Sequence, residues 1–291
     1  MTTVSLVLGS GGARGLAHIG VIRWLEEHGL TIRSIAGCSA GAVIGGVYAA
    51  GKLDEFEAWT RSIRRLDVIN LLDIAWSRSG LVRGDKIIGA LTKIVGIHAI
   101  EDLPVNFTAV AVDITNEKEV WIRTGDLFSA IRASISIPLF FTPFPVNGAS
   151  LIDGGVLNPV PIAPTFGDGT DLTIAVNLDA EDRGMARPPV NSQLAQGSRS
   201  KIQGALAALS GRLYPKGTPS REAAGDDVFA VALHAFETMQ STIARQKLAA
   251  YPPDHLVEIS RSAARMLEFD RAEELIALGY MQADAALGGK I

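Results

Sequence analysis

Gly37-Cys38-Ser39-Ala40-Gly41 is the stretch of this sequence from which the fold can be worked out. It reads G-x-S-x-G and lies between an apolar run, residues 32–36, and a small-residue helical pattern, residues 40–50. A strand, a tight turn and a helix in that order form the nucleophile elbow, which exposes a serine hydroxyl above a sheet. Gly37 and Gly41 allow neighbouring backbone to approach, and the N-terminus of the helix favours negative charge near the serine. Ser39 is therefore a candidate nucleophile.

The residues before this stretch have the same order of strand, loop and helix. Residues 4–8 read as a buried strand, residues 9–15 as a glycine-rich loop, and residues 16–29 as a helix. Two such units predict an α/β fold with a parallel sheet. Further strands are expected at residues 107–112, 119–122, 151–152, 172–176 and 255–259, and further helices are expected to begin near Asp54, Asp85, Asp126, Asp226 and the capping box Asp270-Arg271-Ala272-Glu273.

The composition excludes several classes of protein. Of the 291 residues, 47% are hydrophobic and 20% charged, which argues against disorder, and the net charge of −4 argues against a nucleic-acid partner. Cys38 is the one cysteine, so no internal disulfide can form. The N-terminus lacks a signal peptide pattern, and no apolar run reaches the roughly 18–20 residues of a membrane span. We expect a single domain over residues 1–291 in the cytoplasm, with no metal because no ligand cluster has the required spacing.

The glycine-rich loop suits the binding of an anion. Its small residues allow the backbone N–H groups of Gly11 to Arg14 to converge on one negative charge, as an oxyanion hole requires. A nucleotide-binding loop is the alternative. The G-x-G-x-x-G pattern fails because Arg14 stands where the third glycine belongs, and no Lys-Ser or Lys-Thr follows Gly15.

The residues leave the identity of the catalytic base open. The usual hydrolase order would combine Asp153 with His234 or His255, although the first lies in a helical pattern and the second at a strand start. Asp153 itself ends an apolar run before Gly154-Gly155, at the carboxyl end of a strand, where ligands bind in α/β sheets. An ordinary Asp-Gly turn would look the same. We expect Cys38 to turn away from the Ser39 hydroxyl, into the packing.

Three blocks in order carry a resemblance to a known family. Residues 11–15, 37–41 and 153–155 are similar to the signature blocks of the patatin-like phospholipase family. Residues 80–84, 133–140 and 275–280 resemble its bacterial branch, so the resemblance spans nearly the whole chain. It implies a three-layer α/β/α sandwich with a mainly parallel central sheet. Gly9-Ser10 stands where plant relatives carry an aspartate.

The resemblance also implies the roles of site residues. Ser39 would be the nucleophile and Asp153 its base, in a dyad without histidine. The backbone N–H groups of Gly11, Gly12 and Arg14 would form the oxyanion hole. The expected function is a serine acyl hydrolase that cleaves carboxylic esters of lipids through an acyl-enzyme, without a cofactor. The alternatives are a carboxylesterase or thioesterase for soluble acyl compounds, and a regulatory protein with a vestigial site. We further expect burial to raise the pKa of Asp153.

Two stretches are candidates for contact with lipid. Residues 183–221 hold seven basic residues and no Asp or Glu, and we expect this insertion to act as a lid that touches anionic membrane at the inner face. Residues 61–76 combine three arginines with apolar side chains. A half-buried helix or a solvated loop is the alternative for each. The sequence leaves the oligomeric state open.

Overall fold

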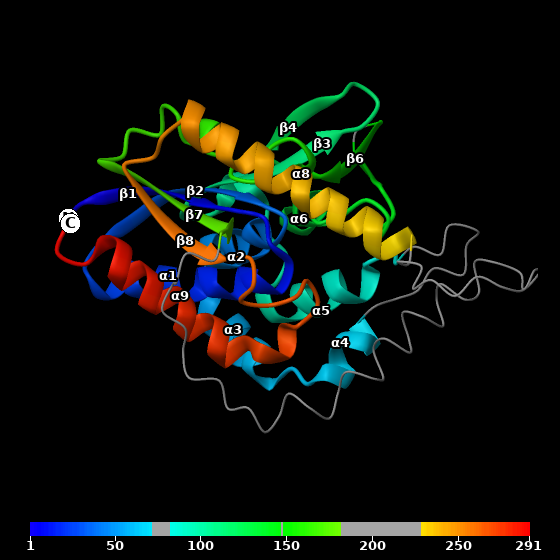
Figure 1. Cartoon of the computed structure of the whole chain (residues 1–291), viewed down its shortest axis with the longest axis horizontal. Helices are drawn as coiled ribbons and strands as arrows, with labels where there is room; N and C mark the ends of the chain where they lie inside the picture. The colour runs from blue at the N-terminus through cyan, green and yellow to red at the C-terminus, as the bar shows by residue number, and fades with distance from the viewer. Residues whose placement is uncertain (72–81, 147, 182–227) are drawn as a thin grey trace, which may run out of the picture.

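A computed structural model describes residues 1–71, 82–146, 148–181 and 228–291 (Figure 1). The expected insertion at 183–221, residues 72–76 of the second candidate stretch and residues 80–81 of one family block lie outside the described residues. One eight-stranded sheet organises the described chain, in the order β5-β6-β3-β2-β1-β7-β8 with β4 paired to β3. Its strands are β1 (Thr3–Leu8), β2 (Thr31–Cys38), β3 (Asn106–Asp113), β4 (Lys118–Ile122), β5 (Phe144–Val146), β6 (Ala149–Asp153), β7 (Leu172–Ala180) and β8 (His255–Ser260).

Five neighbouring strands of the sheet, β3-β2-β1-β7-β8, are parallel. The strands β4, β5 and β6 pair antiparallel and extend the sheet on the β3 side. The central strands are buried, as their nearly continuous apolar sequences require: all of β1 after Thr3 and all of β3 after Asn106 is buried. The predicted α/β fold with a mainly parallel sheet is confirmed.

The two edges of β3 bring distant parts of the sequence together. One edge pairs with β4 along residues 109–113. The other edge must therefore serve both β2, at residues 106–110, and β6, at residues 111–113. On that edge Val110 is the partner of Cys38, and the next residue, Ala111, is the partner of Asp153. The C-terminal ends of β2 and β6 thus meet at one point of the sheet.

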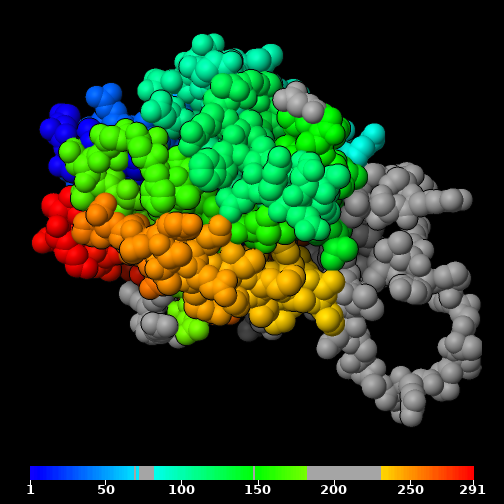
Figure 2. Space-filling model, turned by 90° about the horizontal axis from the view of Figure 1, so that it is seen from above, coloured from blue at the N-terminus to red at the C-terminus, as the bar shows by residue number. Residues whose placement is uncertain are grey.

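Helices cover both faces of the sheet, which makes three layers (Figure 1). Helices α1 (Ala17–Glu27), α2 (Ala40–Ala49) and α9 (Ala272–Leu287) lie on one face, and α8 (Val228–Ala250) crosses the other. Right-handed connections explain this division, because the chain moves from β1 to β2 and β3 in one direction but from β1 to β7 and β8 in the other. Figure 2 shows α8, in yellow to orange, along the surface of the molecule.

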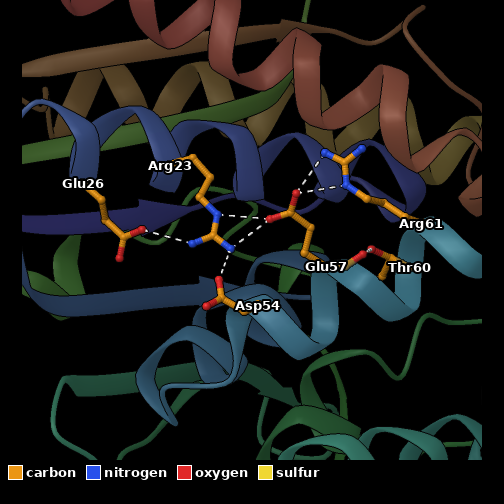
Figure 3. Close-up of polar contacts among 6 residues, drawn as sticks. All are labelled: Arg23, Glu26, Asp54, Glu57, Thr60 and Arg61. Carbon is orange, nitrogen blue, oxygen red and sulfur yellow. Dashed lines mark hydrogen bonds and ion pairs between the residues drawn. The ribbon is translucent and has the colours of Figure 1, made fainter.

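The described chain has four further helices, α3 (Leu53–Ser62), α4 (Arg65–Leu71), α5 (Asp85–Val95) and α6 (Leu127–Ser134), the last of which packs on β3 and β6. Charged side chains fasten α3 to α1 (Figure 3). Arg23 of α1 donates to Glu57 through two nitrogen atoms, at 3.1 and 3.0 Å, and also bonds Asp54. Glu57 accepts two bonds from Arg61, at 3.0 and 2.9 Å, through its other oxygen. Glu57 is therefore the centre of a charged clamp, Arg23–Glu57–Arg61.

The structure corrects several predicted helix starts. Asp126 caps α6 as expected, since its carboxylate accepts the Ser129 N–H at 2.7 Å. Asp54 and Asp85 instead lie in the first turns of α3 and α5. Their negative charges interact favourably with the helix dipole there, but neither makes a capping hydrogen bond. The predicted capping box before α9 is absent, because residues 269–271 form a 3₁₀ turn and Arg271 stands at the cap without a side-chain bond.

Among the described residues no helix is long and apolar enough to cross a membrane.

Candidate active site

Ser39 occupies the sharp turn between β2 and α2. Its backbone has φ 54° and ψ −120°, a left-handed conformation that strains a residue with a side chain. The Ser39 N–H donates to Ser134 Oγ at 2.9 Å, and that hydroxyl donates to the Val110 carbonyl at 2.6 Å. Ser134 thus ties the strained turn to β3.

The glycines on either side of the turn stand where backbone segments touch. A Cβ atom on Gly41 would lie 2.0 Å from the Leu8 carbonyl oxygen, and one on Gly37 would lie 2.4 Å from the Gly41 carbonyl oxygen. Both distances are shorter than any side chain tolerates. The spacing G-x-S-x-G is therefore a packing requirement of this turn.

Asp153 is completely buried at the end of β6. Its Oδ1 accepts the Gly155 N–H at 2.7 Å, and its own N–H donates to the Ser136 carbonyl at 3.0 Å. Oδ2 has no hydrogen-bond partner among the described residues. Burial raises the pKa of Asp153 to about 6, while the Ser39 hydroxyl and the Gly155 N–H act on it in the opposite direction. The carboxylate is thus a stronger base than an exposed aspartate and is fixed through one oxygen only.

Cys38 departs from the expectation that it would serve packing alone. Its buried thiol lies 3.7 Å from Asp153 Oδ1, because the two residues pair with adjacent positions of β3. Burial, followed by the charge of Asp153, raises the pKa of this thiol well above its usual range. Cys38 therefore remains a neutral donor toward Asp153.

The glycine-rich loop is anchored at several points. The Ser10 N–H donates to the Pro159 carbonyl at 2.8 Å, and the Ala13 N–H to the Met266 carbonyl at 2.9 Å. Since the Ala13 N–H is used in this way, the sequence expectation that every N–H from Gly11 to Arg14 faces one anion is too broad. The buried His18 ring lies 2.9 Å from the Gly9 carbonyl, and burial lowers the pKa of His18 to about 4, so a neutral ring donates to that carbonyl.

The Arg14 side chain makes its polar contacts with residues at the C-terminal ends of β7 and β8. Its guanidinium donates to the Arg261 carbonyl at 2.9 Å and lies 3.9 Å from Asp179 Oδ1. Burial is the main influence on the pKa of Arg14, which is lowered, and the carboxylate of Asp179 partly offsets it. If Arg14 contributes to an oxyanion hole, its backbone must do so.

Ser39 borders two unlike cavities. One has a volume of about 150 Å³ and a lining that is almost entirely apolar. Its walls come from α3, α4, α5, residues 135–141 and residues 266–269, and include Phe56, Trp59, Val68, Leu91, Phe140 and Phe269. The other, which we call the polar cavity, measures about 10 Å³ and has a mixed lining: polar groups of the loop and of α8, among them Ser10, Glu237 and Gln240, and the apolar side chains of Ile137, Phe236 and Met266. Ser39, Gly12 and Ile137 border both.

Neither histidine that the sequence left open lies with Asp153. His234 is on α8 with 84% of its side chain exposed, and its nearest charged partner is Glu237, 3.8 Å away. His255 begins β8 and pairs with Ile174, away from the strand ends that carry Ser39 and Asp153. The structure brings Ser39, Asp153 and the glycine-rich loop together without either ring.

Three residues of the site were not identified from the sequence. Ser134 lies in a block that only the resemblance marked, Arg132 lies directly before that block, and Gln240 lies in an ordinary helical pattern. Arg132 is buried and donates to Ser136 Oγ at 2.6 Å and to the Arg83 carbonyl at 2.8 Å, which joins the chain before α5 to the chain that supports Asp153. A buried arginine two residues before a serine in an apolar helix was the available signal.

The family model for patatin-like phospholipase matches residues 6–166, more than half of the chain. The chain belongs to the patatin-like phospholipase family. It is 43% identical over 327 aligned positions to uncharacterised NTE family proteins of Mycobacterium bovis and Mycobacterium tuberculosis, and the alignment covers 98% of this chain and 91% of each relative.

Two longer proteins also match this chain. A lysophospholipase NTE1 of Meyerozyma guilliermondii is 33% identical over 65% of this chain, which corresponds to 13% of that much longer protein. The solved structure of VipD from Legionella pneumophila aligns over 98% of this chain and 67% of its own, with 15% identity and a TM-score of 0.45.

Proposed function

We propose that the chain is a serine acyl hydrolase that cleaves carboxylic esters of lipids, with Ser39 as nucleophile and Asp153 as its base. The observation that supports it best is the position of Ser39, which borders an apolar cavity on a turn beside a buried carboxylate with a raised pKa. Family membership and the lysophospholipase among the relatives are consistent with a lipid substrate.

The reaction follows from this arrangement in two steps. Asp153 accepts the Ser39 proton on its unpartnered Oδ2 as Ser39 Oγ attacks the ester carbonyl. Backbone N–H groups of Gly11, Gly12 and Arg14 stabilise the negative oxygen, and the proton passes from Asp153 to the departing alcohol. Water, deprotonated by the same carboxylate, then releases the fatty acid and restores Ser39.

The two cavities divide the substrate between them. The apolar cavity suits a hydrocarbon chain, whose burial there is favourable by about 0.8 kcal/mol per methylene. The polar cavity on the other side of Ser39 suits the alcohol oxygen and, later, the water. A preference for long acyl chains distinguishes this proposal from a soluble esterase.

The test is hydrolysis of p-nitrophenyl esters from C2 to C16 by wild type, Ser39→Ala and Asp153→Asn. We expect both substitutions to lower turnover at least about 10³-fold, since each removes a member of one catalytic unit. His234→Ala and His255→Ala are the matched controls and should retain wild-type activity. Loss of activity in a histidine variant with retention in Asp153→Asn would replace the dyad by a conventional triad.

The proposed contact with a membrane concerns the apolar side chains near the cavity. Val68 and Leu71 of α4 line the apolar cavity, whereas Leu66 of the same helix is 72% exposed. This part of residues 61–76 thus has an apolar face toward the cavity and one apolar side chain toward solvent. We propose that α4 meets the lipid surface from which the substrate enters.

A further inference from the structure

The helix α8 carries a polar side chain into the small cavity beside Ser39. Ala244 and Leu248 of α8 pack on the sheet, and Lys247 forms an ion pair with Glu119 of β4 at 2.6 Å. Gln240 is one helical turn before Ala244 and so projects from the same side of the helix. The inward face of α8 therefore places an amide at the site.

The Gln240 amide lies among the groups that surround the proposed dyad. Its Nε2 donates to Ser10 Oγ at 3.3 Å. The same nitrogen would be 2.0 Å from a Cβ atom on Gly155, an atom that would also lie 3.0 Å from Asp153 Oδ1. Gln240 thus occupies the space that the missing side chain of Gly155 leaves, directly beside the carboxylate.

The cavity that Gln240 borders has room for about one water molecule. Its volume of about 10 Å³ is near the lower limit for a single water, and such a water needs two to four polar partners. The Gln240 amide, Ser10 Oγ and the Glu237 carboxylate are available on its walls. The apolar cavity on the other side of Ser39 offers no comparable partners.

We propose that Gln240 binds and orients the water that hydrolyses the acyl-enzyme. This inference rests on the proposed function. With an acyl chain in the apolar cavity, the polar cavity gives water a route to the Ser39 ester. Water attacks the ester carbon, Asp153 takes one of its protons, and this proton returns to Ser39 Oγ as the fatty acid leaves. Gln240 orients the water toward the ester carbon, because its amide N–H donates to the water oxygen or its amide oxygen accepts a hydrogen bond from the water.

The experiment measures how the acyl-enzyme divides between water and methanol. Wild type, Gln240→Met and Gln240→Asn hydrolyse a p-nitrophenyl ester at a fixed methanol concentration, and the ratio of methyl ester to free fatty acid is determined. Gln240→Met keeps the length of the side chain but removes its hydrogen bonds, and Gln240→Asn withdraws the amide by one methylene group. We expect the ratio to rise about tenfold in Gln240→Met, the effect of one lost hydrogen bond, and less in Gln240→Asn.

The controls separate this inference from the proposed function. Met239→Leu, on the exposed side of α8, should give the wild-type ratio. A merely structural role for Gln240 slows both products equally, so an unchanged ratio in both Gln240 variants overturns the inference while the dyad stands. If wild type forms no acyl-enzyme on Ser39, the proposed function fails and the inference fails with it.

Discussion

Asp153 combines the properties of a buried acid and of a partly bonded carboxylate. Burial removes water from the charged form and raises the pKa, whereas the Gly155 N–H and the Ser39 and Cys38 side chains favour the charge and lower it. The balance leaves the pKa at about 6, close enough to neutrality for Asp153 to be ionised in most molecules at pH 7 and still accept a proton from serine.

The raised pKa predicts the pH dependence of the reaction. Because the proposed base, Asp153, must be ionised, kcat/KM for a short p-nitrophenyl ester should be constant above about pH 7 and fall about tenfold per pH unit below the Asp153 pKa of about 6. A profile measured between pH 4 and 9 checks this. A profile that stays flat down to pH 4 would mean that the base has the pKa of an ordinary exposed aspartate.

The raised pKa of Asp153 also predicts how stability depends on pH: stability falls as the pH rises, whereas activity increases. The native pKa of Asp153, about 6, exceeds the ordinary value of 3.8, so the folded chain binds the proton more tightly and loses stability as the pH rises through this interval. Asp153→Asn removes the buried charge. We expect its free energy of unfolding to exceed that of wild type by up to about 3 kcal/mol at pH 7, and the difference to shrink toward pH 4.

Urea unfolding of both proteins at pH 4, 5.5 and 7 measures this difference. Asp179→Asn is a useful control, since Asp179 is a second carboxylate at the same end of the sheet that lies beside a cation, Arg14. Equal stability of wild type and Asp153→Asn at all three values would show that Asp153 ionises without cost.

At the scale of elements, α3 is a wall of the apolar cavity whose position depends on charges. Phe56, Trp59 and Ile63 line the cavity on one side of the helix, while Glu57 on the other side receives the guanidinium groups of Arg23 and Arg61 (Figure 3). Arg61 also reaches Glu273 of α9 at 2.9 Å. The charged clamp thus joins three helices, and this distinguishes it from an isolated surface pair.

Glu57→Gln should therefore loosen α3. Because it removes the charge shared by two arginines, we expect a loss of about 1–2 kcal/mol and a decrease of the melting temperature by a few degrees. Differential scanning calorimetry at low and high salt measures the melting temperatures of wild type and Glu57→Gln, and the difference between them should be smaller in high salt. Glu55→Gln, which removes only an exposed pair with Lys52, is the matched control and should change little. A melting temperature equal to that of wild type would contradict the role of the clamp.

At the scale of the molecule, the sequence predicts the layers of the fold better than it predicts which strands pair with one another. Strand β1 is a short, mostly apolar run that ends at glycines, and β2 ends in the G-x-S-x-G turn; each is followed by a helical pattern, and this local order predicts a parallel sheet. The pairing of β6 with the free end of β3 depends instead on where β2 stops, at Cys38. No local pattern contains that information, so the contact of Asp153 with Cys38 could not be foreseen from spacing.

The residues of the candidate site differ in the same way: local sequence patterns indicate some of them, and only the three-dimensional arrangement reveals the others. The G-x-S-x-G turn predicts Ser39 as a candidate nucleophile, whereas Asp153 before Gly154-Gly155 is one of several candidate bases until the family resemblance is considered. Gln240 was missed, since a glutamine in a helix is ordinary and only the approach of α8 to Gly155 gives it a particular place. The predicted cap before α9 was wrong because residues 269–271 form a 3₁₀ turn, which places Arg271 at the cap position, and an arginine side chain cannot accept a backbone N–H.

The loop near Ser39 is held by segments that come much later in the chain. Residues 1–181 contain Ser39, Asp153 and all of the glycine-rich loop, yet Met266 bonds Ala13, Gln240 bonds Ser10, and α9 covers α1. A piece that ends at residue 181 would leave the edge of β7 and the apolar side of α1 open to water, and would tend to aggregate. Expressed together with a second piece that starts at residue 228, it would regain its contacts with α8, β8 and α9. Two fusion partners carrying these pieces would thus form a split enzyme, and released p-nitrophenol would report their association.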